Sequence, residues 1–301
     1  MTPDSITPDL KTVLRRLRLS PILATLPERL VLARDQKMPH QDFLLLALGD
    51  EVSRRDSEAT AMRARRARLD PIMRLEAWDA TALVTFDRTL LNELVSMRFV
   101  HARAHVAIVG PVGVGKTFLA HALGHIACRH GCSVLALRTD QMLKLLRHAR
   151  LDHSYEAELR KLLAVDLLVL DDFGLDAMDS TESRDAYEIF TERHRAGSMI
   201  VTSNRGPDEW LATFADPMRA QSAIDRFTGN AYDLIIDGDS YRPRQKPRLV
   251  DPDPGFESDA HRNPRTNALD PGIHRSTPTP TPTATSDSKG RAQPTGQRGR
   301  R

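Results

Sequence analysis

A glycine-rich stretch at residues 110–117 carries the residue types that bind phosphate groups. It reads GPVGVGKT and fits the pattern G-x-x-x-x-G-K-[ST]. Glycines let the backbone turn tightly and point successive N–H groups at phosphate oxygens. In this pattern Lys116 reaches the β- and γ-phosphates of a nucleoside triphosphate, and the Thr117 hydroxyl binds Mg²⁺. The stretch therefore predicts a site for a nucleotide and its metal ion.

The segments on either side of this stretch predict the elements that the motif requires. Residues 105–109 form a short apolar run typical of a buried strand. After the stretch, apolar residues recur at helical spacing as far as Gly131. A helix that begins at the glycine loop adds the positive end of its dipole to the phosphate site. A chance match in a glycine-rich turn is the alternative, and the flanking strand and helix argue against it.

Two acidic residues follow a second apolar run. Asp171 and Asp172 come directly after residues 167–170, a run typical of a buried parallel strand. Because ligands bind at the carboxyl ends of such strands, we expect both carboxylates beside the phosphate loop. Asp171 would hold Mg²⁺, and Asp172 would polarise the attacking water. A strand that ends in a surface turn with two acids is the other interpretation.

A third apolar run, residues 198–204, ends in Asn204. We expect this amide at the same edge of the sheet, where it could orient the lytic water because an amide both donates and accepts hydrogen bonds. Taken alone, an Asn before Gly206-Pro207 is also typical of a turn cap.

The composition is that of a globular protein with a slight excess of positive charge. The 301 residues allow one full domain with additions, or two domains. A net charge of +3 and a sequence pI near 9.0 are compatible with nucleic-acid binding. Cys128 and Cys132 do not indicate a disulfide framework, which favours a reducing compartment. Because the sequence has no signal-peptide pattern and no apolar run as long as a membrane span, we expect a cytoplasmic protein without membrane contact.

The first 74 residues predict a small helical domain. Apolar residues at helical spacing continue from Leu10 to Gly49, and prolines at positions 21, 27 and 39 are expected to divide them into two or three helices. The basic stretch that follows favours a helix. It is either a phosphate-contacting surface for double-stranded DNA or a solvated face with local ion pairs, and the sequence favours neither. Its arginines are Arg54, Arg55, Arg63, Arg65, Arg66 and Arg68.

The remaining segments complete the expected organisation. Asp70-Pro71 is expected to end the basic helix, residues 72–88 to connect two domains, and residues 90–100 to form another helix. Residues 247–301 are rich in Pro, Thr and Arg and are predicted to be a disordered tail with a solvated basic end. We therefore expect a helical, basic DNA-contacting domain at 1–74, a nucleotide-binding domain at 75–246 and a tail at 247–301.

Five motifs occur in a characteristic order along the chain. They are GPVGVGKT at 110–117, LDDFG at 170–174, TSN at 202–204, AIDRF at 223–227 and GDSYR at 238–242. In this order they resemble the IstB-like ATP-binding proteins of insertion sequences, relatives of the DnaC helicase loader among the AAA+ ATPases. The resemblance covers about residues 75–246. It implies an α/β fold, an AAA+ P-loop module with a parallel sheet flanked by helices, after a small helical domain.

The resemblance also implies roles for single residues. Asn204 corresponds to the sensor 1 position, and Arg226 to the arginine that reaches a neighbouring subunit's nucleotide. Arg242 corresponds to sensor 2, which acts on the nucleotide of its own subunit. The expected catalytic residues are therefore Asp172, Asn204 and Arg226. The expected Mg²⁺ ligands are Thr117 and Asp171. The residues expected to bind ATP are Gly110, Pro111, Gly113, Gly115, Lys116, Thr117, Phe118 and Arg242.

The implied function is that of a transposition helper. Members of the family form ATP-dependent homo-oligomers on double-stranded DNA and help a partner transposase select target DNA. A replicative helicase loader related to DnaC is the alternative that the ATPase module does not distinguish. Asp172 stands where many AAA+ proteins carry Glu, so a scaffold that hydrolyses ATP slowly is a further alternative. A small-metabolite kinase is disfavoured by the paired acids, by Asn204 and by the arginine motifs.

Other polar and aromatic residues do not predict additional sites. His121 and His125 lie four residues apart, and so do His101 and His105. Neither pair has the Glu that follows the first histidine in zinc proteases. The two cysteines lack companion ligands at zinc-site spacing. We expect Trp78 and Trp210 to pack within the protein, because isolated aromatic residues are weak evidence for stacking on bases.

Overall fold

The computed structural model describes residues 6–245 of the chain. Contacts divide the chain into two units, residues 1–247 and 248–301. The predicted tail at 247–301, with its basic end, lies outside the described residues.

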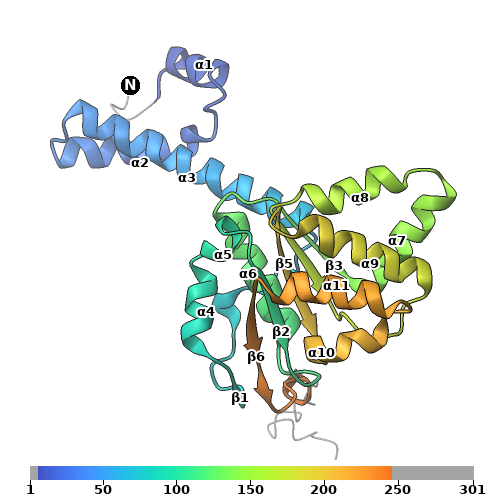
Figure 1. Ribbon diagram of the computed structural model, residues 1–301. Coiled ribbons are helices and arrows are strands. Elements are labelled where there is room, and N and C mark those ends of the chain that lie inside the picture. The colour runs from blue at the N-terminus through green and yellow to red at the C-terminus, as the bar shows by residue number, and fades with distance from the viewer. Residues whose placement is uncertain (1–5, 246–301) are drawn as a thin grey trace, which may run out of the picture. The chain divides into compact units, whose positions relative to one another are not determined.

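Five parallel strands form the central sheet (Figure 1). The sequence predicted a parallel sheet, but it did not predict the strand at residues 231–235. Their order is β3-β4-β5-β2-β6. The strand before the phosphate loop, β2, therefore lies between β5, which ends in Ser203, and β6. Because all neighbouring pairs are parallel, the carboxyl ends of the strands meet at one edge. The strands are β2 (His105–Val109), β3 (Val134–Arg138), β4 (Leu167–Asp171), β5 (Ser198–Ser203) and β6 (Ala231–Ile235).

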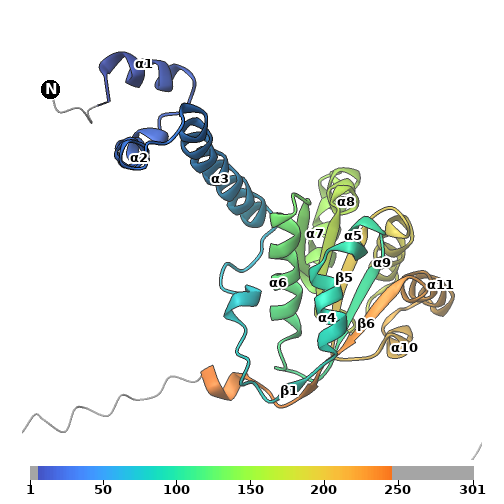
Figure 2. The ribbon, with the colours of Figure 1, turned by 90° about the vertical axis from the view of Figure 1, so that its left-hand side faces the viewer.

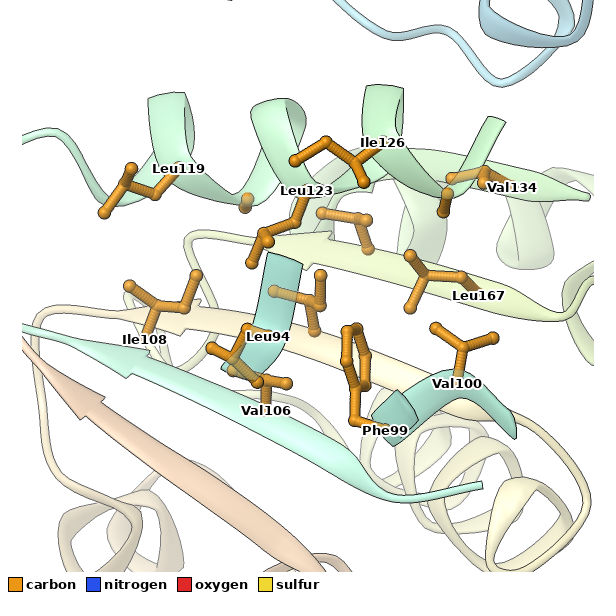
Figure 3. Packing of buried hydrophobic residues seen from close by; sticks show 14 of the residues in the cluster. Leu94, Phe99, Val100, Val106, Ile108, Leu119, Leu123, Ile126, Val134 and Leu167 are labelled. Carbon is orange, nitrogen blue, oxygen red and sulfur yellow. The ribbon is translucent and has the colours of Figure 1, made fainter. Parts of the chain in front are cut away.

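Helices cover both faces of this sheet, because successive side chains of a strand point to opposite faces. Val106 and Ile108 of β2 face the helices α4 to α6, and Figure 3 shows Leu119 and Leu123 of α6 packed above them. Leu168 and Leu170 of β4 face the opposite group of helices. The first group is α4 (Arg88–Val95), α5 (Arg98–His101) and α6 (Lys116–Arg129). The second group is α7 (Thr139–Leu151), α8 (Tyr155–Ala164), α9 (Ser180–Arg193), α10 (Pro207–Trp210) and α11 (Pro217–Thr228).

Short elements connect these layers near the phosphate loop. β1 (Val84–Thr85) pairs antiparallel with β7 (Asp237–Gly238), which brings the end of the described chain back to the segment before α4. The 3-10 turns are η1 (Leu75–Ala77), η2 (Leu211–Thr213) and η3 (Arg242–Gln245).

The N-terminal helices, seen in Figure 2, are α1 (Pro8–Arg16), α2 (Ile22–Asp35) and α3 (His40–Arg66). They share a small core around Ile22, Leu26 and Ala47. The prediction that Pro27 divides a helix was wrong, because α2 continues through it. A proline inside a helix removes one backbone donor, and the buried Leu26 beside it fixes the helix to the core.

Two predicted helix boundaries also differ from the structure. The helix expected over residues 90–100 is divided at Met97, which has a φ of 59°. This left-handed residue ends α4 and lets Phe99 and Val100 of α5 turn into the core. The basic helix α3 ends at Arg66, before the expected break at Asp70-Pro71, and Arg68 has a φ of 60°.

The end of α3 is attached to the sheet domain by specific contacts. The Arg63 guanidinium donates to the carbonyl of Cys128 at the end of α6, at 2.9 Å. The N–H of Ala136 in β3 donates to the carbonyl of Ala67 at 2.8 Å, so the backbone after α3 covers part of the exposed edge of β3. These contacts join the arginine-bearing helix to the helix that carries the phosphate loop.

Candidate nucleotide-binding site

The phosphate loop connects β2 to α6 and has the backbone conformation that its glycines allow. Gly113 and Gly115 have φ values of 86° and 102°, a left-handed region that disfavours other residues. Space is restricted as well, because a β-carbon at Gly113 would lie 2.1 Å from the Ser240 hydroxyl oxygen. The loop therefore needs glycine at both positions for its shape and for its close neighbours.

Lys116 is the first residue of α6 and is 6% exposed. Its ammonium group donates to the carbonyl oxygens of Gly110 and Pro111, at 2.8 and 2.6 Å. Burial lowers the pKa of Lys116, while the carboxylates of Asp172 and Asp171 act in the opposite direction. The cation is thus held at the loop by two carbonyls, which a phosphate could replace as partners.

Thr117 and Asp171 meet across the space between α6 and β4. The Thr117 hydroxyl lies 2.9 and 3.0 Å from the two carboxylate oxygens of Asp171. Thr202 of β5 also donates to this carboxylate, and the Thr139 hydroxyl donates to the Asp171 carbonyl at 2.9 Å. A hydroxyl and a carboxylate held together are the oxygen ligands that Mg²⁺ accepts, together with phosphates and water. The two residues fit the predicted metal site.

Asp172 turns away from its neighbour because its own backbone is left-handed, with a φ of 56°. Its N–H donates to the Thr202 hydroxyl at 3.0 Å, which fixes this turn. Burial raises the pKa of Asp172, and the adjacent charge of Asp171 raises it further. Its carboxylate lies 3.9 Å from the guanidinium of Arg138. The two adjacent acids therefore occupy different environments, one bound to hydroxyls and one directed into the cavity beside the loop.

A cavity of about 430 Å³ lies beside the phosphate loop and collects most of the predicted residues. The sequence placed these residues on separate strands and loops, and the common edge of the parallel sheet brings them together. Gly110 and Pro111 do not line the cavity, but their carbonyls hold Lys116. The predicted residues that line it are Gly113, Gly115, Lys116, Thr117, Phe118, Asp172, Asn204 and Arg242.

The apolar side of the cavity was not predicted. Trp78 lines it and packs edge-on against Phe118, with ring centroids 5.4 Å apart. Trp78 thus packs, as expected, and it also faces the site. Ile72 and Met73 complete this side from the segment expected to be a simple connection. No motif marks these residues, and only their place in the cavity wall identifies them.

The last described residues close over the other side of the loop. The N–H of Tyr241 donates to the Gly113 carbonyl at 2.9 Å, and Arg242 follows it along the cavity wall. The Arg244 guanidinium donates to the Thr81 carbonyl at 3.0 Å and lies 3.4 Å from the Asp79 carboxylate. These bonds explain how Arg242, distant in sequence, reaches the cavity of its own chain.

Arg226 lies outside the cavity. It belongs to α11, where its guanidinium donates to the Ser222 carbonyl at 2.9 Å and to the Ser222 hydroxyl. Its own carbonyl contacts the His194 ring at 3.0 Å. Arg226 does not line the cavity of its own chain. Its expected role, toward the nucleotide of another subunit, therefore stays a prediction.

The six arginines of the basic stretch have different environments. Arg54 pairs with Glu51 and Glu58, and Arg55 pairs with Glu51. Arg63 contacts the end of α6, as described above. The other three, Arg65, Arg66 and Arg68, are exposed and form no ion pair with any described residue.

The histidines of α6, His121 and His125, bind the backbone of Asp70. The ring of His121 accepts the N–H of Asp70 at 3.0 Å, and the ring of His125 contacts the Asp70 carbonyl at 2.8 Å. Among residues 6–245, no group of three or more His, Cys, Asp or Glu side chains could hold a metal ion. None of the described helices combines the length and apolar character that crossing a bilayer requires.

Known proteins resemble this chain over most of its length. It is 36% identical to a Mycobacterium tuberculosis protein named as an ATP-binding protein of an insertion sequence, over 80% of this chain and 96% of the relative. It is 32% identical to the protein named as the ATP-binding protein of insertion sequence IS21 from Pseudomonas aeruginosa, over 79% of this chain and 90% of the relative. A crystal structure of the DnaC helicase loader aligns with a TM-score of 0.45 and 20% identity, over 55% of this chain and 96% of that one. The family model described as IstB-like ATP binding protein matches residues 12–248, and the chain belongs to this family.

Proposed function

We propose that this protein is an Mg²⁺-dependent ATPase that assembles on double-stranded DNA and assists a transposase in selecting target DNA. The contact that carries the ATPase proposal is the one between Thr117 and Asp171, with Asp172 directed into the adjacent cavity. A metal-binding pair on the loop side and a second acid facing the substrate are the two parts that phosphoryl transfer to water needs.

The residues would divide the reaction as follows. Lys116 exchanges its two carbonyl partners for phosphate oxygens and orients the γ-phosphate. Mg²⁺, when held by Thr117 and Asp171, supplies positive charge to the phosphate oxygens. Asp172 accepts the proton of the attacking water, and its raised pKa makes it a stronger base than a solvated aspartate. Asn204, at the same cavity, hydrogen-bonds the water and holds it in line.

Two arginines would complete the site from different chains. Arg242 lines the cavity of its own chain and would contact the phosphates directly. Arg226 lies outside that cavity and would act on the nucleotide of a neighbouring copy. Such an arginine accelerates phosphoryl transfer by about 10³–10⁵ in other nucleotide triphosphatases. ATP would therefore favour oligomers, because it supplies the negative charge that the neighbouring Arg226 binds.

The test compares ATP turnover with and without duplex DNA and follows assembly by light scattering. We expect DNA to stimulate turnover and ATP to promote oligomers, and the Lys116→Ala variant to lose both effects. Assembly on DNA that is unchanged in Lys116→Ala would refute the proposal. Co-purification of the full chain with a replicative helicase, and not with the transposase of the same element, would instead support the helicase-loader alternative.

A further inference from the structure

The positive charge of the N-terminal helices is not continuous along α3. Residues 50–58 hold two arginines and four acids, and the arginines are engaged by these acids. The Glu51 carboxylate is 4% exposed, and hydrogen bonds from Arg54 and Arg55 lower its pKa to about 2. Arg54 also pairs with Glu58. This part of the helix therefore carries no excess of positive charge, and its two arginines are held in ion pairs within the helix.

A first cluster of free positive charge lies at the end of α1, outside the stretch that the sequence singled out. Arg15, Arg16 and Arg18 are exposed and form no ion pair with residues 6–245. The backbone of this segment is fixed to α3, because the Arg55 guanidinium donates to the Arg18 carbonyl at 2.9 Å. The structure thus brings the turn after α1, with Arg18, beside Arg55 of α3.

A second cluster lies where α3 ends. Arg65, Arg66 and Arg68 are exposed and unpaired within the described chain, and residues 59–68 contain no acid. The contacts of Arg63 and Ala67 with the sheet domain anchor this segment. The three arginines of this cluster are therefore held beside α6 and β3 of the sheet domain.

The helix between the two clusters begins with two acids, Asp56 and Glu58, and Glu58 is paired with Arg54. Every residue from 56 to 62 is exposed except Thr60, which is partly buried, and the side chains at 57, 59, 60 and 61 are small. Arg66 lies eleven residues after Arg55, about three helical turns, so the two share a face and stand about 17 Å apart along the axis. The major groove of B-DNA is about 12 Å wide between its phosphate-bearing walls. A duplex across residues 56–62 would meet one cluster on each side.

We propose that double-stranded DNA lies across residues 56–62 of α3, with its phosphates contacted by Arg15, Arg16 and Arg18 on one side and by Arg65, Arg66 and Arg68 on the other. The proposal rests on the proposed DNA-binding function and gives it a surface. It adds Arg15 and Arg16 of α1, and Arg18 of the turn that follows, to the residues that bind DNA. It assigns Arg54 and Arg55 to ion pairs within the N-terminal helices.

The experiment measures the affinity of the full chain for a duplex over a range of salt concentrations, with ATP and Mg²⁺ present. Two variants each remove one cluster: R15Q/R16Q/R18Q and R65Q/R66Q/R68Q. The matched control, R88Q/R160Q/R184Q, removes the same charge at exposed arginines that form no ion pair with described residues. Removing one arginine–phosphate interaction lowers the slope of log K against log salt by about 0.9. We expect the slope of each cluster variant to fall by about 2 to 3 per bound protomer, and the control to keep the wild-type slope.

The outcomes separate this surface from the proposed function. Wild-type slopes in both cluster variants, with DNA binding intact, would overturn the surface and leave DNA binding in place. A reduced slope in R54Q/R55Q alone would also overturn it, because these arginines would then bind the phosphates. Absence of any duplex binding by the wild-type protein would refute the proposed function itself. Circular dichroism and ATP affinity verify that each variant is folded.

Discussion

The indole ring of Trp78 lies against the backbone of Gly115, so closely that a β-carbon at position 115 would stand 2.7 Å from the ring. Trp78 belongs to the segment between the N-terminal helices and the sheet, whereas Gly115 belongs to the phosphate loop. The contact gives the cavity an aromatic wall directly beside the residues that would bind phosphate. An aromatic face at that position is suited to a nucleoside.

The first prediction concerns the two tryptophans as fluorescent reporters. Trp78 lines the cavity, whereas Trp210 is 0% exposed and its indole N–H is bound by Ser203 and Arg205. We expect ATP to change the emission of the wild-type protein and to leave that of Trp78→Phe unchanged. Trp78→Ala should weaken ATP binding by about tenfold, since an aromatic contact with a base is worth roughly 1–3 kcal/mol. An ATP-dependent change that persists in Trp78→Phe would place the nucleotide elsewhere.

A second prediction separates the two adjacent acids. Asp171 is bound by the hydroxyls of Thr117 and Thr202, whereas Asp172 faces the cavity. Asp171→Asn should abolish the part of the ATP affinity that depends on Mg²⁺, because the metal loses its charged ligand. Asp172→Asn should bind ATP as the wild type does and turn it over about 10²–10⁴ times more slowly, because the general base is removed.

These two variants are compared by ATP titration with Mg²⁺ or with chelator, and by single-turnover hydrolysis. Thr202→Val is a useful companion, since it removes a hydroxyl that positions both acids without removing a charge. Normal turnover in Asp172→Asn would contradict the role given to this residue. The slow-scaffold interpretation would then gain support if the wild type itself showed almost no turnover.

The third prediction tests Arg226 by mixing subunits. Arg226→Ala should bind ATP normally, because the side chain lies outside its own chain's cavity, but its turnover should fall by about 10³–10⁵. Lys116→Ala should fail to bind ATP yet still present a normal Arg226. Mixtures of the two inactive variants should therefore recover part of the turnover. If no mixing ratio restores activity, Arg226 acts within its own chain, where it contacts Ser222 and His194.

The fourth prediction concerns stability at low pH. His105 is 0% exposed, stacks on Phe227, and accepts the N–H of Met199 at 3.2 Å. Burial lowers its pKa to about 4. An unfolded histidine has a pKa of about 6.5, so between these values the unfolded chain binds a proton that the folded chain does not. Stability should fall as the pH is lowered through this window, by about 3 kcal/mol from this residue when the pH reaches 4.

His105→Gln isolates this effect, because glutamine can accept the same N–H and does not titrate. Urea unfolding of both proteins at pH 7 and at pH 4.5 gives the difference. We expect the variant to be less stable than the wild type at pH 7 and to lose less stability on acidification. Equal losses in the two proteins would show that His105 is not the titrating group.

The nucleotide site was largely predictable because its chemistry is encoded in short contiguous motifs. Residues 167–170 read as a buried strand and are each 0% exposed, so the position of Asp171 at the sheet edge followed. The rule that carboxyl ends of parallel strands meet at one edge then placed Asp172 and Asn204 beside Lys116. The sequence therefore determined the sheet, the phosphate loop and the polar residues that face it.

Only the tertiary structure decided what surrounds those residues. Trp78 reaches Gly115 through folding of a segment that carries no motif. Tyr241 belongs to the GDSYR motif, but its backbone bond to Gly113 follows only from the folding of that segment over the loop. The arginine stretch reads as one run of charge, yet buried Glu51 pairs with Arg54 and Arg55 in its first part. The backbone of Arg18, in the turn after α1, binds Arg55. Periodicity and motifs report which face of an element is buried. Which distant side chain covers a loop or pairs with a charge depends on packing between elements, and this is specified only when the whole chain folds.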